Sequence, residues 1–393
     1  MKIAAVRATP VLIPLEAPYV WAYGVLDGFS KTIVEIETAD GAVGIGEAPS
    51  HGSAAIIDRW AERLRGRDPI DIAGAELACL PFQRGVQSIT EFDLLGAWGG
   101  VEMALWDLRG RLWGRPVADL LGGAVRREIP FTDYFSYRLA QDGKGGEASV
   151  EAVVDYCLML REAFGTTFFE GKVSDPDVGA NIRLVGALRD ALGPDAMIRI
   201  DSNQAFSVPT AVRLAPAFEE FGVRNWEDPV AGMEEMARLR PRTAIPFSSH
   251  NTDLPKALRL GAPDAIVSNV AGFGGFTRML RFVSACEEMG VDFWCYSGDS
   301  GLGTAAYLHA CAAHPHIREP NQSLLRMQPF DVIAEGPLAP RNNVLALPEG
   351  PGLGVTLDRD RLAFCARLLV ERGAPDKHRD PARPGVHRRM PLV

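Results

Sequence analysis

Membrane-spanning runs, a secretion signal and an excess of basic residues are all missing from this sequence. No apolar run approaches the ~20 residues that a membrane-spanning helix needs. The first residues include Arg7 and Pro10 without a small-residue cleavage pattern, so we expect no signal peptide. The 41 Lys and Arg are outnumbered by 50 Asp and Glu, for a net charge of −9. Nucleic-acid-binding domains usually carry a basic excess, so we expect neither a membrane nor a nucleic acid as partner.

Paired cysteines are also absent. The six cysteines are scattered, with no CxxC pair and no regular spacing. We therefore expect reduced, buried thiols and a cytoplasmic protein. What is present is typical of a packed globular chain, because 47% of the 393 residues are hydrophobic and 23% are charged.

Residues 1–125 have the pattern of an α+β domain. The β-branched, alternating stretch from Lys31 to Thr38 is followed by the turn residues Asp40 and Gly41, and Val43 begins a second strand. This pattern predicts a β-hairpin. Helical patterns follow around residues 53–66 and 99–114.

From about residue 129, short apolar strands alternate with amphipathic helices, which predicts βαβ units. Eight such steps over roughly 190 residues favour a parallel β/α barrel over a doubly wound sheet, and no GxGxxG follows a strand. The predicted strands are Ile129–Tyr134, Thr167–Lys172, Met197–Asp201, Arg224–Glu227, Ile245–Ser249, Asp264–Asn269, Val291–Tyr296 and His316–Glu319.

Three strands in a row end in groups that bind hard cations. Asp201 and Glu227 end the third and fourth strands, and either His250 or Asn251 ends the fifth. As an oxygen donor, Asn251 suits Mg²⁺ better than His250 does. The spacing is one βα unit each time, so these side chains should meet at the barrel mouth, where chemistry occurs in β/α barrels. A single strand-end Asp would more simply cap the next helix. Three polar residues at equivalent ends of neighbouring strands predict a Mg²⁺ site instead.

Lys172 ends the strand before the first of these acidic residues. A lysine at a barrel mouth beside a cation loses solvation and is repelled by the positive charge. Both effects lower its pKa and make it available as a base. In a strand of unknown position, a surface lysine would be the simpler interpretation.

Several segments together resemble the enolase superfamily, in its mandelate racemase and glucarate dehydratase branch. They are IRIDSN (198–203), WEDP (226–229), Lys172, LPEGPGLGV (347–355) and GIGEAP (44–49). The resemblance implies an N-terminal α+β capping domain over a modified (β/α)7β barrel of the TIM type. It also implies one Mg²⁺ per subunit, an enediolate formed from a small carboxylate substrate, and a symmetric homo-oligomer.

On this basis the chain divides into a capping domain (1–125), a barrel (126–330), a segment returning to the capping domain (331–373) and a flexible tail or strap to a neighbouring subunit (374–393). The sequence departs from the family pattern in two places. Glu170 stands where many relatives have the first Lys of a Lys-x-Lys pair, and it could pair with Lys172 and raise its pKa. Tyr296 and Asn269 stand where relatives have a His–Asp dyad, which argues against racemisation by that dyad.

We therefore expect a Mg²⁺-dependent lyase that dehydrates an acid sugar. Lys172 would take the α-proton, and Tyr296 with Asp299 would assist loss of the hydroxyl. The alternatives are an epimerase or cycloisomerase of the same superfamily, and a metal-binding scaffold with weakened catalysis. The residues expected to bind substrate are Glu170, Asn203, Asn269, Glu319, His51 and Trp21.

Overall fold

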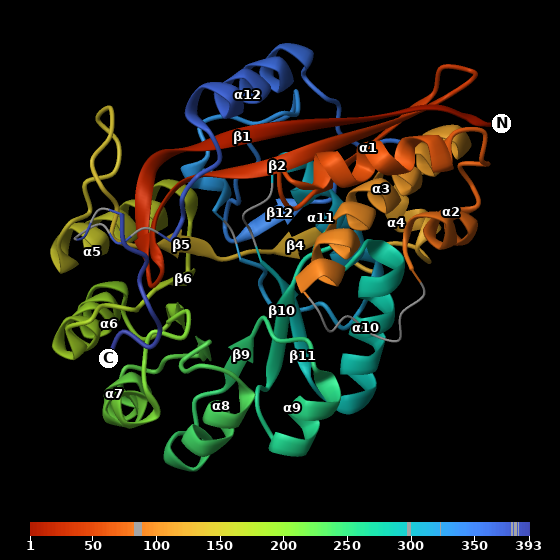
Figure 1. Cartoon of the computed structure of the whole chain (residues 1–393). Helices are drawn as coiled ribbons and strands as arrows, with labels where there is room; N and C mark the ends of the chain where they lie inside the picture. The colour runs from red at the N-terminus through yellow and green to blue at the C-terminus, as the bar shows by residue number, and fades with distance from the viewer. Residues whose placement is uncertain (82–88, 297–299, 323, 379, 381–382, 384) are drawn as a thin grey trace.

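In a computed structural model, an N-terminal domain lies against a β/α barrel, and a C-terminal segment returns to the first domain (Figure 1). The structure describes residues 1–81, 89–296, 300–322, 324–378, 380, 383 and 385–393. Asp299, one of the predicted catalytic residues, lies outside these ranges.

The N-terminal domain is built on an antiparallel sheet of three strands. In this sheet β1 (Ile3–Trp21) pairs with β2 (Gly24–Thr38), and β2 pairs with β3 (Val43–Ala48). The hairpin predicted at Asp40 and Gly41 is therefore present. The helices of this domain are α1 (Ser53–Leu64), α2 (Ile72–Cys79), α3 (Ile89–Trp113) and α4 (Val117–Leu120).

Two glycines of the GIGEAP segment allow α3 to lie directly on β3. A Cβ atom at Gly44 would lie 2.2 Å from the carbonyl oxygen of Ala104, and one at Gly46 would lie 2.2 Å from that of Gly100. Any side chain would separate the two backbones, so glycine is required at both positions. This part of the motif sets the packing of the first domain.

Seven parallel strands form the barrel sheet, and their order in the sheet follows the sequence from β5 to β11. They are β5 (Asp133–Phe135), β6 (Phe168–Lys172), β7 (Met197–Asp201), β8 (Asn225–Glu227), β9 (Phe247–Ser249), β10 (Ala265–Ser268) and β11 (Asp292–Cys295). The intervening and following helices are α5 (Val150–Phe164), α6 (Val178–Leu192), α7 (Val208–Glu220), α8 (Met233–Leu239), α9 (Leu254–Leu260), α10 (Phe276–Met289) and α11 (Gly301–Ala313). The predicted barrel is confirmed.

The two ends of the barrel sheet differ from the prediction. The stretch predicted as the first strand is divided between β4 (Glu128–Pro130), which pairs outside the barrel sheet, and β5. Residues 316–319 form no strand, so the predicted eighth strand is wrong. Closure occurs just beyond them, where Asn321 bridges to Phe131 and the backbone N–H of Gln322 donates to the Cys295 carbonyl.

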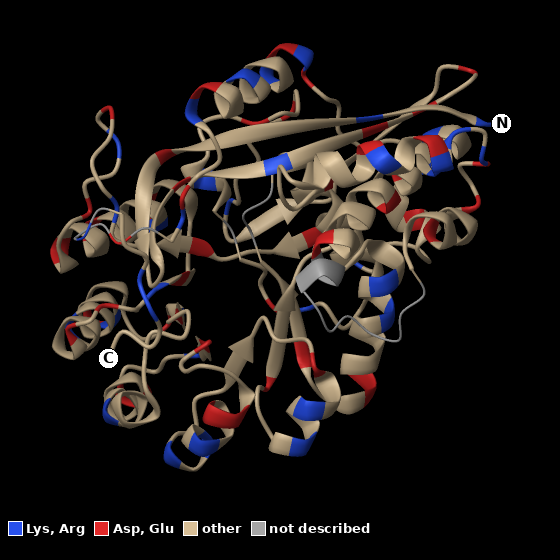
Figure 2. Ribbon diagram, viewed as in Figure 1, with Lys and Arg blue, Asp and Glu red and all other residues tan. Residues whose placement is uncertain are grey.

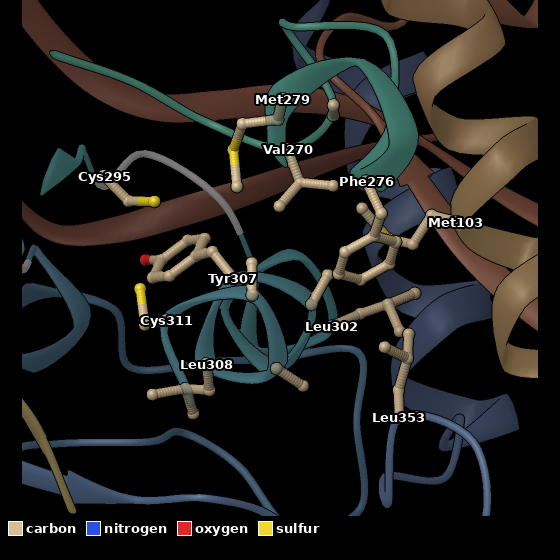
Figure 3. Close-up of a cluster of buried hydrophobic side chains, with 14 of the residues drawn as sticks. Met103, Val270, Phe276, Met279, Cys295, Leu302, Tyr307, Leu308, Cys311 and Leu353 are labelled. Carbon is tan, nitrogen blue, oxygen red and sulfur yellow. The ribbon is translucent and has the colours of Figure 1, made fainter. Parts of the chain in front are cut away.

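The largest apolar cluster lies where α10 and α11 pack against the barrel and the N-terminal domain. Figure 3 shows Phe276 and Met279 of α10 beside Leu302 and Tyr307 of α11, with Met103 of α3 adjoining them. This cluster ties the first domain to the second half of the barrel. A separate apolar cluster fills the opposite side of the barrel, between β5–β8 and α5–α7.

The C-terminal segment connects back to the first domain. The strand β12 (Val344–Ala346) pairs with β4, and α12 (Arg359–Arg372) contacts β1. We expected residues 374–393 to be a flexible tail or a strap to a neighbouring subunit. In the structure, their described part lies along the chain's own barrel, and the Leu392 N–H donates to the Ala205 carbonyl.

The surface and the thiols agree with the composition. In the view of Figure 2, Lys and Arg alternate with Asp and Glu over the outer helices, and no side of one sign stands out. All six cysteines are buried and free. Among the described residues, no helix combines the length and the apolar character that a membrane span requires.

Candidate functional site

Lys172, Asp201 and Glu227 lie side by side at the carboxyl ends of three adjacent strands. Each is the last residue of its strand, and the register pairs Lys172 with Asp201 and Asp201 with Glu227. Since parallel strands present equivalent positions at one edge, the three side chains share the barrel mouth. The structure therefore brings together the residues that the strand-end spacing singled out.

The Lys172 ammonium lies in a buried pocket of one carboxylate and two aromatic rings. Its Nζ is 2.5 Å from Asp201 Oδ2 and 5.7 Å from the ring centres of both Trp21 and Tyr134. Burial lowers the pKa of Lys172, but Asp201 and the hydroxyls of Tyr134 and Tyr19 raise it well above its ordinary value. In the protein alone, Lys172 is thus held in its charged form.

Asp201 is enclosed by donors from its own strand end. The Asn203 backbone N–H donates to Oδ1 at 2.8 Å, and Asn203 Nδ2 donates to Oδ2 at 3.0 Å. Asn203 adopts a φ of +45°, which turns the chain back toward the carboxylate. Burial raises the pKa of Asp201, while Lys172 opposes this effect. The side-chain oxygen of Asn203 is buried and has no hydrogen-bond partner.

Glu227 is fully buried and bridges two neighbours. Its Oε1 lies 3.0 Å from His250 Nε2, and its Oε2 accepts a 2.5 Å hydrogen bond from Gln322 Nε2. Burial raises the pKa of Glu227, but His250, Lys172 and Arg199 together lower it below the ordinary value.

Glu170 lies one layer deeper in the barrel than Lys172. Its carboxylate faces Arg199 at 3.1 Å and accepts a 2.5 Å hydrogen bond from Gln322. The expectation that Glu170 pairs with Lys172 is therefore wrong. Both side chains point to the same side of β6, but on β7 Arg199 lies opposite Glu170 and Asp201 lies opposite Lys172. Burial raises the pKa of Glu170 to about 8, although Arg199 opposes the shift. Because Glu170 precedes Lys172 by two residues on β6, it lies below the level of Lys172, Asp201 and Glu227.

The structure distinguishes His250 from Asn251. Ser248 pairs with Glu227 in the sheet register, so His250, two residues further on, projects to the same side. His250 Nδ1 lies 3.1 Å from the Val267 carbonyl, which leaves Nε2 facing Glu227. Asn251 turns away, and its Oδ1 accepts from the Asp253 N–H at the start of α9.

Glu227 also controls the charge of His250. Burial lowers the pKa of His250, but the carboxylates of Glu227, Asp228 and Asp201 raise it to about 9.

Tyr296 and Asn269 lie at the ends of β11 and β10. The Tyr296 ring packs edge-on against His250, with ring centres 4.8 Å apart. Asn269 is buried, and its Oδ1 accepts from the Gly272 N–H at 2.6 Å. Its side-chain nitrogen is buried without a hydrogen-bond partner. Both residues therefore adjoin the side of the site formed by His250.

The two predicted residues of the N-terminal domain behave differently. Trp21, at the end of β1, reaches the Lys172 ammonium, as its ring distance shows. His51 is exposed, and its Nδ1 lies 3.0 Å from the Ser30 hydroxyl. Among the described residues, no hydrogen bond, ion pair or ring contact joins His51 to Lys172.

Glu319 is not part of this group. Its two carboxylate oxygens accept hydrogen bonds from Arg224 Nη2 at 2.9 and 3.0 Å. Arg224 immediately precedes β8, so this pair lies at the amino ends of the strands, opposite the mouth. The misplaced eighth strand explains the wrong prediction, because closure occurs two residues further on.

Three further residues at or near the site, Gln322, Tyr134 and Asp228, are not among those predicted from the sequence. Gln322 sits in the single-residue closure of the barrel, which leaves no strand pattern in the sequence. Tyr134 ends the predicted strand Ile129–Tyr134, and nothing in the sequence distinguishes it from an apolar strand residue. Asp228 follows Glu227 within WEDP, is buried, and accepts from Ser249 Oγ at 2.7 Å. Burial raises the pKa of Asp228 to about 7.

The donor set at the mouth suits a hard divalent cation. Asp201 and Glu227 supply buried carboxylate oxygens on adjacent strands, and Asn203 adds a buried oxygen without a partner. As the side chains lie, Lys172 faces Asp201 and Gln322 faces Glu227. No three described His, Cys, Asp or Glu side chains are arranged around one point. Binding a cation would therefore require small rotations of these side chains.

Comparison with family models assigns both halves of the chain. Residues 3–122 match the mandelate racemase / muconate lactonizing enzyme N-terminal domain, and residues 151–361 match the enolase C-terminal domain-like family. The chain belongs to this enolase-superfamily group. The resemblance inferred from the short motifs is thereby confirmed, and the protein is an enzyme of that superfamily by descent.

Curated members of the family carry different activities. The chain is 30% identical to a protein of Streptomyces coelicolor named probable glucarate dehydratase, over 97% of this chain and 95% of that protein. It is 29% identical to the D-galactarolactone cycloisomerase of Agrobacterium fabrum, over 92% and 98%.

A solved member of the family has the same architecture. An enolase from Pseudomonas fluorescens, with bound magnesium, potassium and tartrate, superimposes with a TM-score of 0.86 at 25% identity. The match covers 95% of this chain and 93% of that one.

Proposed function

We propose that this protein is a Mg²⁺-dependent lyase that dehydrates a hydroxylated carboxylic acid of the acid sugar class.

 The observation that carries the proposal is the register of Lys172, Asp201 and Glu227 on three adjacent strands. It joins one basic side chain to two carboxylates at a single mouth. A relative named glucarate dehydratase and a solved relative holding magnesium and tartrate support the same chemistry.

In this proposal, Asp201, Glu227 and His250 hold the cation. The two carboxylates provide the hard oxygen ligands that Mg²⁺ prefers. His250 is oriented through its Nδ1. Its Nε2, which faces Glu227 in this structure, would turn toward the ion and give up its proton. When bound, Mg²⁺ would attract the substrate carboxylate and stabilise the negative charge that develops as the α-proton leaves.

Lys172 is the residue that takes the α-proton. In the protein alone, Asp201 raises the pKa of Lys172 and keeps it charged. A cation held by Asp201 would replace Lys172 as the partner of that carboxylate and repel the ammonium, which lowers the pKa of Lys172. The rings of Trp21 and Tyr134 then hold the amine at the mouth.

Tyr296 is the residue that assists loss of the hydroxyl group. It follows β11, whereas Lys172 ends β6, and β7–β10 separate these strands in the sheet. The two side chains therefore approach a bound substrate from different sides. A phenol with an ordinary pKa near ~10 donates a proton more readily than it accepts one at neutral pH. This arrangement favours elimination over racemisation, which needs a base on both sides.

A cycloisomerase is the second candidate, because the relative from Agrobacterium fabrum carries that name at 29% identity. The two candidates share the α-proton step and differ in what leaves the substrate. We propose that the chain acts as a homo-oligomer in the cytoplasm on a small carboxylate. The oligomeric state can be measured directly by light scattering.

The deciding experiment incubates the Mg²⁺-loaded protein with a panel of acid sugars and their lactones in D₂O. A dehydratase releases a keto-deoxy acid, whereas a cycloisomerase converts a lactone without loss of water. An epimerase incorporates deuterium without either product. If no compound exchanges its α-proton, while calorimetry shows that tartrate binds, the chain is a scaffold with weakened catalysis and the proposal is wrong.

Three variants assign the residues within that experiment. His250→Ala should weaken Mg²⁺ binding, whereas Asn251→Ala should not, because Asn251 faces the start of α9. Tyr296→Phe keeps the ring packed on His250 and removes only the hydroxyl. We expect it to slow loss of the β-hydroxyl more than α-proton exchange. Equal losses would indicate that Tyr296 only positions the substrate.

A further inference from the structure

The described residues that follow α12 pair with one another and return toward the barrel. The Asp380 N–H donates to the Val386 carbonyl at 2.8 Å, and the Arg388 N–H donates to the His378 carbonyl at 3.4 Å. In Figure 1 the dark-blue chain descends from α12, passes the far end of β1, and ends beside α6 and α7. We call residues 377, 378 and 385–393 the strap.

The first anchor of the strap is the turn between β1 and β2. The Trp21 indole N–H donates to the Lys377 carbonyl at 3.0 Å. In return, Arg388 Nη1 donates to the carbonyls of Trp21 and Ala22 at 3.2 and 3.3 Å. The His378 ring packs against the rings of Trp21 and Tyr23, with centres 5.9 and 5.4 Å apart. The turn is thus held through both its backbone and its side chains.

The second anchor is the loop that follows β7. The Leu392 N–H donates to the Ala205 carbonyl at 2.7 Å, and the Ser207 N–H donates to the Val393 carbonyl at 2.6 Å. The side chains of Met390, Leu392 and Val393 pack against the apolar cluster under α6 and α7. This contact buries apolar surface and secures the end of the strap on the barrel.

Both anchors adjoin the proposed active site. Trp21, held by the first anchor, has its ring 5.7 Å from Lys172 Nζ. Ala205, held by the second, is two residues beyond Asn203, whose amide contacts Asp201. The strap therefore spans from the turn above the proposed base to the loop beside the proposed metal ligands.

We propose that the strap determines which substrates the site accepts, by holding the Trp21 turn over Lys172. Arg388 is the main positioning residue, because its side chain is only 14% exposed and donates to two carbonyls of the turn. With the turn held in place, the Trp21 ring covers the lysine, excludes water from it and limits the length of an acid that can lie beside it. This inference rests on the proposed function, since it takes the Lys172 mouth as the active site.

The test compares Arg388→Ala and a truncation after Pro375 with the control Arg372→Ala, which alters an exposed arginine at the end of α12. Hydrogen exchange of the backbone amides of residues 19–26 measures how firmly the turn is held, and needs no substrate. We expect ~10-fold faster exchange in Arg388→Ala, from the loss of two hydrogen bonds to a charged group. The truncation should accelerate exchange more than Arg388→Ala does. Arg388→Lys should exchange more slowly than Arg388→Ala, and Arg372→Ala should exchange at the rate of the parent.

Binding of tartrate to the Mg²⁺-loaded variants provides the second measurement. We expect the dissociation constant for tartrate to rise ~10-fold in Arg388→Ala, while Mg²⁺ affinity stays at the parent value. Unchanged exchange in both strap variants would overturn the inference, whatever the enzyme's reaction is. Faster exchange with unchanged tartrate affinity would also overturn it, because the strap would then stabilise the turn without affecting ligand selection. Loss of α-proton chemistry in the parent would refute only the proposed function.

Discussion

Two groups of buried carboxylates in this protein have opposite surroundings. Glu102 of α3 accepts four hydrogen bonds: from the Phe276 N–H, the Thr277 N–H and hydroxyl, and the Trp106 indole. Burial raises the pKa of Glu102, and these bonds oppose the shift. At the barrel mouth, Asp201 and Glu227 instead lie beside each other, and each faces a basic side chain.

The surroundings of a buried carboxylate therefore decide whether it stabilises the fold or can bind a cation. Glu102 is surrounded by neutral donors at the start of α10, so it ties the first domain to the barrel and has no capacity left for a ligand. Asp201 and Glu227 repel each other, and a divalent cation would relieve that repulsion. The comparison predicts that changes at Glu102 affect stability, whereas changes at the mouth affect metal binding and catalysis.

The largest effect is expected from Lys172→Ala. Removal of a general base typically slows its step by ~10²–10⁴-fold. The rate of α-proton exchange with D₂O should fall by that amount, measured by NMR on the substrate found in the acid sugar panel. An exchange rate close to the parent's would show that another residue is the base.

Glu102→Ala should reduce stability more than any mouth variant. It leaves several buried donors of Phe276, Thr277 and Trp106 without an acceptor, and we expect a loss of ~3 kcal/mol in the free energy of unfolding. Denaturant titration followed by circular dichroism measures this loss. Its Mg²⁺ affinity should equal that of the parent, and a weaker affinity would contradict the division between the two groups.

Asp201→Asn should weaken Mg²⁺ binding and leave the stability of the fold largely unchanged, the reverse of Glu102→Ala. The amide keeps the shape of the side chain and can still accept from Lys172, so the fold should persist. The charge that would bind the cation is lost, and we expect Mg²⁺ affinity to fall by ~100-fold or more. Calorimetric titration decides the point, with Glu102→Gln as the matched control. An unchanged affinity in Asp201→Asn would remove this residue from the metal site.

Gln322→Leu tests the amide that joins the two layers of the barrel. Its Nε2 donates to both Glu170 and Glu227 at 2.5 Å. Without these bonds Glu227 loses its orientation, and we expect Mg²⁺ affinity to drop ~10-fold. Calorimetry that shows parent-like affinity would mean that Gln322 only fills the barrel.

The smallest effect concerns pH and lies outside the mouth. Burial raises the pKa of Asp331 to about 6, although backbone N–H groups of Gly301, Val332 and Ile333 oppose it. The folded state therefore binds this proton more tightly than the unfolded state, so its contribution to stability is lost as pH rises from about 4 to about 6. Asp331→Asn should remove that part of the pH dependence. Parallel stability curves for parent and variant across this range would contradict it.

Part of this protein could be deduced from sequence because its signals are local and periodic. Strands such as Met197–Asp201 bury both faces, and each is followed by a helix with one apolar face, so the barrel is visible in the pattern. The spacing of one βα unit then places Lys172, Asp201 and Glu227 at one edge. These features depend only on residues close together in the chain.

Other features depended on contacts that leave no local pattern. The closure at Asn321 is a single bridge, so the strand predicted at 316–319 and the role given to Glu319 were wrong. The sequence left His250 and Asn251 open as the third metal ligand. Which of them faces Glu227 depends on the side of β9 to which each projects, and a shift of one residue reverses that side.

The strap is the clearest case of what tertiary structure alone decided. Arg388 meets the carbonyls of Trp21 and Ala22 across more than 360 residues of chain. A hydrogen bond from a side chain to a distant backbone carbonyl requires no hydrophobic periodicity and no particular neighbouring residue, so it leaves no signal in the sequence. The sequence by itself determined the barrel and the polar ends of its strands, because those follow from alternating burial. Only the folded chain determined what covers them, because that depends on which distant surfaces come into contact.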